Sequence, residues 1–400
     1  MHHASFSTTH GQVSVKASWV RHGRKGGKNR QSRSVPSEDS SEVAQPETRR
    51  PPATSNPTFL RNMSGKLVLI TGVSGFIAGH VALAFLEAGY RVRGYVTARA
   101  EKLKKLNQVV SVPGLEFTQI NDVATDDFTE ALKDVDILVH VASPLSGKGS
   151  VDELLTSAIN GTLNVLKQAV AAGVEKIVVT SSIAAAYTPG ASAGAVISDS
   201  QWGQVTREEV PAHASDDFFV YSSSKILAER AVWKLAREHP NVDVATILPA
   251  FVFGPFPQHF PFPSSPSALG TNGAIYKLIN GQVPPLLSPF VVDVRDVAKA
   301  HLLAVSVPRV PKGGDLDQKR FLVCSGVYTW KDVATDMRKS RPGLKTPSPE
   351  NIPTMSGNLS TVDTTRAREV LGMKEWITPK KTVEDAVDSL VEAQKTWATL

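Results

Sequence analysis

Short apolar runs alternate with longer amphipathic stretches along residues 63–249. The apolar runs predict buried strands at 66–71, 91–96, 115–120, 135–141, 176–181 and 242–248. Apolar residues at helical spacing, in several cases closed by glycine or proline, predict helices at 76–88, 126–132, 151–172 and 219–238. Strands that alternate with helices in this way are typical of a parallel sheet covered on both faces. We therefore predict an α/β fold built on a doubly wound parallel sheet.

The pattern changes after residue 249. Residues 253–267 are rich in proline and phenylalanine, which is typical of an irregular apolar loop. Shorter candidate elements follow at 291–305, 321–324 and 329–338. We therefore expect a main domain over residues 63–249 and a smaller C-terminal lobe over residues 250–400, interleaved with the main domain.

The first 62 residues are rich in serine, basic residues, proline and glycine and show little apolar periodicity. Such a segment cannot bury enough apolar surface to offset its ordering entropy, so we expect a disordered basic extension. Seven Lys and Arg residues precede the first acid, Glu38, as in a mitochondrial transit peptide. Cytoplasmic localisation is the prediction, and mitochondrial targeting and an over-long gene model stay as alternatives.

Charge and composition exclude several classes of protein. Residues 1–62 carry ten basic and four acidic residues, which accounts for the whole net charge of +6, so the remainder shows no excess for binding nucleic acid. A single cysteine, Cys324, excludes a disulfide scaffold and a cysteine-based metal site. No run of 18 apolar residues occurs, so no membrane span is predicted. No metal site is predicted either.

A glycine-containing loop joins the first predicted strand to the first predicted helix, from Thr71 to Ala78. Gly72 suits a tight turn, and Gly75 lets the backbone approach a phosphate at the free N–H groups of the helix, which opens with Phe76 and Ile77. Ala78 stands at the third position of the fingerprint. The loop predicts a Rossmann-type dinucleotide site, and a merely structural turn is the alternative.

The residues after the second predicted strand indicate which dinucleotide is bound. No acid stands at the end of the strand itself to bind a ribose 2′-hydroxyl, and Arg99 and Lys102 follow. Cations at this position suit a 2′-phosphate through charge-assisted hydrogen bonds, so NADP(H) is the predicted cofactor. The alternative is an exposed basic turn without a ligand.

Two further segments carry candidate chemistry. Tyr221 and Lys225 are four residues apart and so share one face of the predicted helix, where an ammonium stabilises a phenolate and makes the phenol a stronger acid. Ser181 and Ser182 end a predicted parallel strand, where open α/β sheets bind ligands. A structural tyrosine and a capping role for Ser181 are the alternatives. Together the segments predict a site that protonates a carbonyl oxygen.

The sequence resembles the extended short-chain dehydrogenases/reductases of the dihydroflavonol-reductase and yeast methylglyoxal/ketone-reductase type, within the NAD(P)-dependent epimerase/dehydratase superfamily. The resemblance covers residues 63 to about 390, and the matching stretches are 71–78, 139–144, 178–182, 221–225, 248–255 and 292–301. These motifs as a set are specific to the family but not to a substrate.

The resemblance implies roles for individual residues. Ser182 would bind the substrate carbonyl, Tyr221 would be the general acid, and Lys225 would also hold the nicotinamide ribose. The remaining implied cofactor contacts are Asp122, Val123, Ala142, Pro249 and Val252. Asp293 and Asp296 match a family motif, but we expect them to bond backbone groups at a strand-to-helix junction. One departure is that relatives usually place the phosphate-binding arginine where Thr97 stands here.

The resemblance implies an NADPH-dependent reductase that transfers a hydride to a ketone or aldehyde of a small or medium, apolar or aromatic metabolite. Residues 63–249 would bind NADP and carry the catalytic residues, residues 250–400 would bind the substrate, and the enzyme would be a monomer or homodimer. The alternatives are a nucleotide-sugar epimerase or dehydratase and a regulator that senses NADP without catalysis.

Overall fold

The computed structural model describes residues 65–97, 106–107, 110–143, 150–189, 194–311, 313–355 and 359–397. All of them belong to one structural unit, which spans residues 53–400. The main sheet consists of β1 (Leu67–Thr71), β2 (Arg91–Thr97), β3 (Leu115–Ile120), β4 (Ile137–His140), β5 (Lys176–Thr180), β7 (Asp243–Pro249) and β10 (Arg320–Val323). The helices on the sheet are α2 (Phe76–Glu87), α4 (Thr129–Leu132), α5 (Val151–Ala171), α6 (Asp217–Glu238) and α8 (Val294–Ser306).

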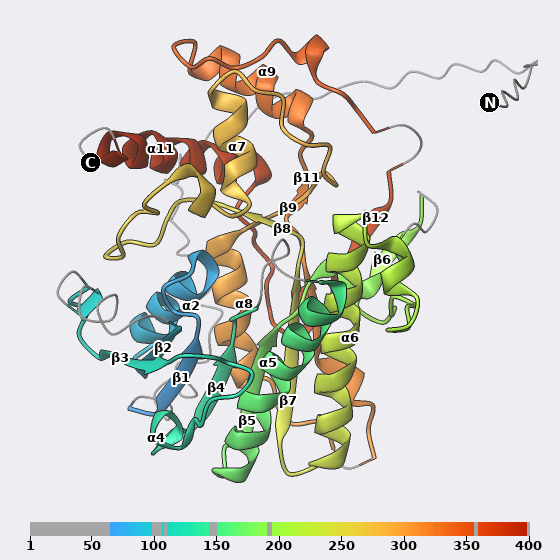
Figure 1. The fold of residues 1–400 in the computed structure, drawn as a ribbon. Coiled ribbons are helices and arrows are strands. Elements are labelled where there is room, and N and C mark those ends of the chain that lie inside the picture. Colours follow the sequence, from blue (N-terminus) through green and yellow to red (C-terminus); the bar gives the residue numbers. More distant parts are fainter. Residues whose placement is uncertain are drawn as a thin grey trace, which may run out of the picture. The chain divides into compact units, whose positions relative to one another are not determined.

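The seven strands are parallel and lie in the order β10-β7-β5-β4-β1-β2-β3. The order reverses between β1 and β4, and open α/β sheets bind ligands at the carboxyl ends of the strands at such a reversal. The predicted Rossmann-type doubly wound α/β sheet with a smaller C-terminal lobe is confirmed (Figure 1).

Alternate residues of the central strand β1 supply the cores on the two faces of the sheet. Val68 and Ile70 pack with apolar residues of α2 and α8, and Leu69 packs with those of α5 and α6. Every residue of β1 is buried, because helices cover both faces. This explains why the strand reads as an uninterrupted apolar run rather than as an alternating pattern.

The C-terminal lobe stands at the carboxyl ends of these strands (Figure 1). A second sheet is formed by β8 (Phe251–Phe253), β9 (Phe290–Asp293) and β11 (Gly326–Val327), and its helices are α7 (Asn272–Ile279), α9 (Trp330–Ser340) and α11 (Pro379–Trp397). The remaining elements include a parallel pair, β6 (Val196–Ser198) with β12 (Thr361–Asp363), and the short helix α10 (Thr365–Glu369).

The structure differs from the sequence expectation in three elements. Of residues 321–324, expected in the lobe, 321–323 belong to β10 and form the edge of the main sheet beside β7. Residues 291–305 divide into β9 and α8, and α8 packs against α2 and the main sheet. The helix expected over 126–132 is only α4, which begins after Phe128; just before it, the Asp127 side chain accepts the Thr129 N–H at 2.8 Å.

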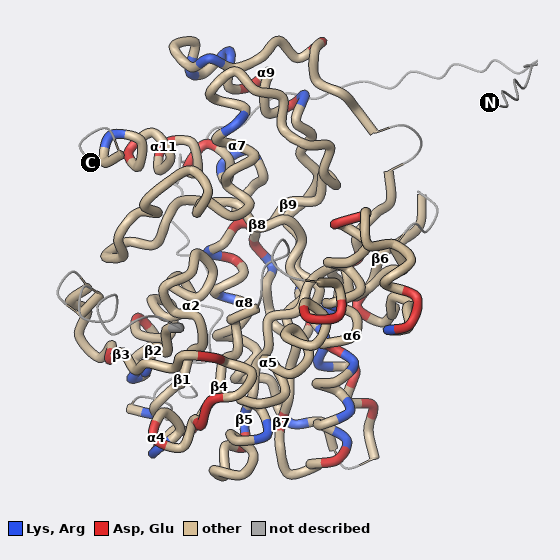
Figure 2. Tube along the Cα trace, in the orientation of Figure 1, with Lys and Arg blue, Asp and Glu red and all other residues tan. Residues whose placement is uncertain are grey.

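Charged residues of both signs are mixed along the chain that the structure describes, for example along α6 and α11 (Figure 2). Three ion pairs of the described residues join residues three or four apart on one helix, for example Lys395 with Glu392. Among the described residues no helix combines the length and the apolar character needed to cross a bilayer.

Candidate active site

The loop after β1 has the backbone of a tight turn that closes against β4. Gly72 has φ +71°, a conformation that favours glycine, and a Cβ there would lie 3.2 Å from Ala142. Thr71 fixes the neighbouring strand ends, because its hydroxyl accepts the N–H groups of Val141 at 2.9 Å and Ala142 at 3.0 Å. Ala142 therefore lies against the loop, at the position proposed to line a cofactor groove.

Helix α2 begins without a side chain that would occupy its first N–H groups. Gly75 is the N-cap, in an extended conformation, and neither a capping hydrogen bond nor an acid is present in the first turn. Phe76 and Ile77 open the helix and are half-buried. The first N–H groups of a helix lack intrahelical partners and attract anions. The loop and helix start therefore fit a dinucleotide pyrophosphate.

The turn after β3 is held by helix α5 beside it. The Asp122 side chain accepts the N–H of Ala124 at 2.8 Å, and the carbonyl of Val123 accepts the Asn164 amide at 3.0 Å. Gly161 of α5 permits this approach, since a Cβ there would lie 3.1 Å from Val123. Asp122 and Val123 thus form an ordered turn at the carboxyl edge of the sheet. Arg99 and Lys102 lie outside the described residues.

Helix α6 presents the tyrosine and lysine in its first three turns. Asp216 caps the helix, and its carboxylate accepts the N–H groups of Phe218 and Phe219, both at 3.0 Å. The Nζ of Lys225 lies 5.7 Å from the centre of the Tyr221 ring. The predicted sharing of one helix face is therefore seen in the geometry.

Ser143 anchors the lysine from the end of β4. Lys225 Nζ donates a hydrogen bond to Ser143 Oγ at 2.7 Å, so the ammonium joins α6 to the β4 end of the sheet. Tyr187 neighbours Tyr221. Burial raises the pKa of Tyr187 to about 12, with a smaller contribution from Tyr221. Tyr187 therefore keeps its proton at neutral pH.

The two serines after β5 have different partners. Ser181 is buried and donates to Glu229 Oε2 at 2.7 Å, which commits its proton. Ser182 Oγ accepts the Ala184 N–H at 3.2 Å and caps the 3₁₀ helix η1 (Ile183–Ala186), which packs against α6. The Ser182 proton has no acceptor in these contacts. The capping contact that was considered for Ser181 is thus made by the acceptor oxygen of Ser182.

His140 is buried in a neutral form at the end of β4. The Thr71 hydroxyl accepts two N–H bonds, so its own proton points to His140 Nδ1 at 3.0 Å and leaves the imidazole proton on Nε2. Burial, and after it the Lys225 cation, lowers the pKa of His140 to about 3. His140 therefore adds no charge near Lys225 at neutral pH.

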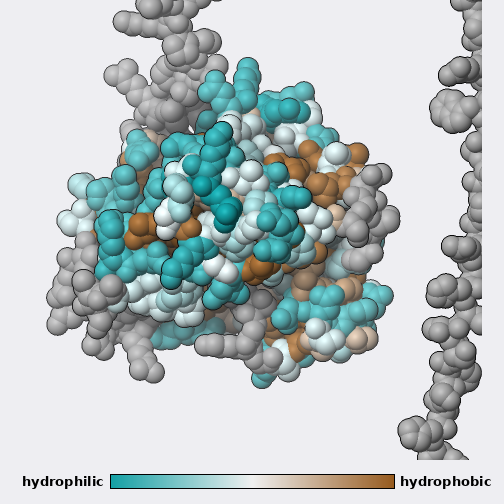
Figure 3. Space-filling view, turned by 90° about the horizontal axis from the view of Figure 1, so that it is seen from above, coloured by the Kyte–Doolittle hydropathy of each residue, from teal (hydrophilic) through white to brown (hydrophobic). Residues whose placement is uncertain are grey.

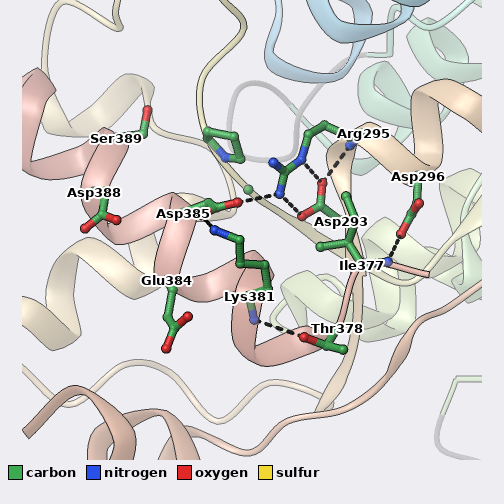
Figure 4. Close-up of polar contacts among 12 residues, drawn as sticks. Asp293, Arg295, Asp296, Ile377, Thr378, Lys381, Glu384, Asp385, Asp388 and Ser389 are labelled. Carbon is green, nitrogen blue, oxygen red and sulfur yellow. Dashed lines mark hydrogen bonds and ion pairs between the residues drawn. The ribbon is translucent and has the colours of Figure 1, made fainter. Parts of the chain in front are cut away.

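The segment after β7 turns from the main sheet into the lobe. Pro249 ends β7 opposite Val323, and Val252 lies in β8 with its side chain in the main core. Asp293 and Asp296 form the polar contacts drawn in Figure 4. Asp293 caps α8 through the Arg295 N–H at 2.8 Å, and Asp296 accepts the Ile377 N–H at 2.8 Å. Both bond backbone groups, as expected, although Asp296 reaches a distant segment.

An apolar cavity of about 220 Å³ lies in the C-terminal lobe. Its walls include Phe253, Trp330 and the exposed side chains of Leu286, Met355 and Leu359. In the view from above, apolar patches lie among hydrophilic surface (Figure 3). None of the candidate catalytic side chains lines this cavity.

Several residues of the site were not singled out from the sequence. Ser143 lies within the matching stretch 139–144, but no pattern in the sequence indicated that it bonds Lys225. Glu229 follows Lys225 by four residues, and that spacing is a signal that could have identified it. Tyr187 carries no local signal in the sequence and directly follows η1 in the structure. Among the described residues, no cluster of three possible metal ligands occurs.

The chain is similar to several known proteins. The model of the NAD dependent epimerase/dehydratase family matches residues 68–317. An oxidoreductase of Schizosaccharomyces pombe is 40% identical over 298 residues, covering 70% of this chain and 84% of that protein. Ketoreductase azaE of Aspergillus niger is 34% identical over 350 residues, covering 82% of this chain and 98% of that protein.

A solved structure has the same fold. Yeast methylglyoxal/isovaleraldehyde reductase Gre2, complexed with NADPH, superimposes with a TM-score of 0.69 and 26% sequence identity. The match covers 82% of this chain and 99% of that one, so it includes both the main sheet and the lobe.

Proposed function

The chain belongs to the NAD dependent epimerase/dehydratase family, and from that premise we propose that it is an NADPH-dependent reductase of ketone or aldehyde carbonyls. The relatives named as a ketoreductase and as a methylglyoxal/isovaleraldehyde reductase support this reaction. The observation that carries the proposal is the placement of Lys225 Nζ 5.7 Å from the Tyr221 ring, with Ser143 anchoring the ammonium.

The residues divide the work of the reaction between them. When bound, NADPH supplies a hydride to the carbonyl carbon. The Tyr221 hydroxyl donates its proton to the carbonyl oxygen, on which negative charge develops. Ser182, whose proton is uncommitted in the contacts above, donates a hydrogen bond to the same oxygen. Lys225 stabilises the resulting phenolate and holds the nicotinamide ribose.

The cofactor is bound along the carboxyl edge of the main sheet. We assign the pyrophosphate to Gly72, Gly75 and the first turn of α2, where the backbone has the required free N–H groups. The remaining assigned contacts are Asp122 and Val123, Ala142, and Pro249 with Val252. Arg99 and Lys102 carry the preference for the 2′-phosphate of NADPH over the hydroxyl of NADH.

The substrate is a small or medium metabolite with an apolar or aromatic body. The phenylalanine-rich segment after β8 supports this class. Phe256 and Phe262 of that segment pack edge to face, with ring centres 5.9 Å apart. Such walls offer dispersion contacts and few hydrogen-bond partners for a sugar nucleotide.

A panel of substrates tests the function directly. NADPH consumption is followed by absorbance with ketones, aldehydes and nucleotide sugars of increasing size. We expect oxidation of NADPH with apolar ketones or aldehydes. Conversion of a nucleotide sugar without net loss of NADPH would select an epimerase or dehydratase. Tight binding of NADPH without turnover of any compound would select a regulator.

A further inference from the structure

A buried ion pair lies beneath the serines that end β5. Arg320 of β10 and Glu229 of α6 are 0% and 2% exposed. The Arg320 Nε donates to Glu229 Oε1 at 2.8 Å, and its Nη2 donates to Oε2 at 3.3 Å. Arg320 Nη1 donates to the carbonyls of Asp199 and Gln201, both at 2.6 Å, and the guanidinium stacks on Trp202 at 3.6 Å. Arg320 is therefore fixed on all sides.

The carboxylate of Glu229 collects bonds from three further side chains. It accepts the hydroxyls of Ser181 at 2.7 Å and Thr246 at 2.8 Å, and the indole N–H of Trp233 at 3.2 Å. With Arg320, these donors come from the segment directly after β5 and from β7, α6 and β10. One buried group therefore joins the strand that ends at Ser182 to the helix that carries Tyr221.

Glu229 also lies in line with the candidate catalytic pair. Tyr221, Lys225 and Glu229 follow one another at intervals of four residues, which places them on one face of α6. Lys225 and Glu229 both line a small cavity of about 20 Å³, and Lys225 bonds Ser143. Among the described residues, no acidic side chain forms an ion pair with Lys225.

We propose that Glu229 and Arg320 are positioning residues of the reductase site, an inference that rests on the function proposed above. Glu229 holds the end of β5 in register with α6, so that Ser182 and Tyr221 reach one carbonyl oxygen. Arg320 neutralises the Glu229 carboxylate, so that the Lys225 cation acts on Tyr221 undiminished.

Other titratable groups near this face do not change charge in the range of the test. His140 of β4 and His301 of α8, which bonds Thr180, are neutral above about pH 5, because burial lowers their pKa values to about 3 and about 4. Tyr187 keeps its proton up to a pKa of about 12. Asp199 is raised in pKa by burial and is paired with Arg366 of α10 at 3.3 Å.

The test is the alkaline limb of the profile of kcat/KM against pH, since reduction requires a protonated acid. Arg320→Gln leaves the Glu229 charge unneutralised about 12 Å from Tyr221, or two helical turns, and should move the limb upward by about one pH unit. Glu229→Gln leaves the Arg320 charge unneutralised and should move the limb downward by a similar amount.

Three control variants separate electrostatics from folding. Arg320→Lys keeps the charge and should leave the limb in place. The double variant Glu229→Gln/Arg320→Gln removes both charges, should return the limb to the wild-type pH, and covers the case in which a single variant does not fold. Lys319→Gln removes one cation of another buried pair, with Asp243, and should lower the melting temperature without moving the limb.

The outcomes are distinct. Limbs at the wild-type pH in folded, active Arg320→Gln and Glu229→Gln would overturn the inference, as would a displaced limb in the double variant. Lack of turnover in the wild-type enzyme would instead contradict the proposed function. In that case, the ionisation of Tyr221 is still measurable by ultraviolet absorbance, as the difference between each variant and the same variant carrying Tyr221→Phe. The midpoints of this titration should shift in opposite directions in Arg320→Gln and Glu229→Gln.

Discussion

At Tyr221 the proton and the ring have separable roles. Tyr221→Phe keeps the ring beside Lys225 but removes the proton, and general acid catalysis contributes about 10²–10⁴ in rate. We expect kcat to fall by a factor in this range while the Kd for NADPH changes less than a few-fold. Steady-state assays of NADPH consumption measure kcat, and fluorescence titration measures the Kd for NADPH.

A matched control for that prediction is Tyr276→Phe. Tyr276 lies on α7 of the lobe and packs on Trp397, with ring centres 5.6 Å apart. Its variant should keep wild-type turnover. Full turnover in Tyr221→Phe would remove this residue from the mechanism.

Cofactor preference is predicted to depend on Arg99. A phosphate gains charge-assisted bonds from arginine that a hydroxyl cannot match, so Arg99→Ala should raise the KM for NADPH by roughly 10- to 150-fold. The KM for NADH should stay nearly constant. Lys102→Ala is the comparison. If Lys102→Ala alone abolishes the preference, Lys102 holds the phosphate, and if neither variant changes it, the basic turn has no role in binding.

Asp296 gives the stability of the fold a defined dependence on pH. Burial raises its pKa from 3.8 to about 6, so between these values the folded state binds more protons than the unfolded state. Stability therefore falls as pH rises through this window. Asp296→Asn keeps an acceptor for the Ile377 N–H and does not titrate, so it should gain roughly 1–3 kcal/mol over wild type as pH rises from 4 to 7.

The measurement is the difference in melting temperature between Asp296→Asn and wild type from pH 4 to pH 8. A difference that grows up to about pH 6 and then levels off is expected. A difference that is constant with pH would show that Asp296 ionises in the folded protein as it does in the unfolded chain.

At the scale of elements, Arg295 connects α8 of the main domain to α11 of the lobe (Figure 4). Its Nη2 lies 2.7 Å from Asp293 Oδ2 and 2.8 Å from Asp385 Oδ2. Arg295→Met leaves the buried Asp293 without its cation, and because Arg295 is partly exposed we expect a loss of about 1–3 kcal/mol. In this variant, the protection of backbone amides against hydrogen exchange should fall more in α11 than in β1.

Lys381→Met is the control for this prediction. Lys381 bonds the same Asp385 from within α11 but is 61% exposed, so its loss should cost less than about 1 kcal/mol. Equal effects of the two variants on α11 would mean that the contact with α8 contributes nothing to docking.

Burial on two faces explains which elements could be predicted from the sequence. The central strands β1, β4, β5 and β7 are buried because helices cover both sides, and they read as largely apolar runs. The spacing of Tyr221 and Lys225 predicted their shared face. By contrast, residues 321–323 are equally apolar, but a local pattern contains no information about the partner strand. Lys225 and Ser143, which are 82 residues apart, meet only through the order of the sheet.

At the scale of the whole molecule, residues 1–62 are predicted to be dispensable. The family match begins at residue 68, and the segment before residue 63 lacks apolar periodicity. A chain that starts at Met63 should keep the turnover and the melting temperature of the full chain. A large loss of either on truncation would show that the extension contributes to the folded enzyme.

The ion pair between Glu229 and Arg320 joins residues that are 91 positions apart in the chain. During synthesis, α6 therefore leaves the ribosome long before the strand that carries its cation. Until β10 is translated, Glu229 must stay hydrated, because a buried carboxylate without a partner costs several kcal/mol. The nascent chain can collapse around β1 to β5, but the β10 edge of the sheet closes only after the first part of the lobe has been made. Translation of a message truncated near residue 250 should therefore yield an incompletely folded chain that chaperones bind and proteases degrade.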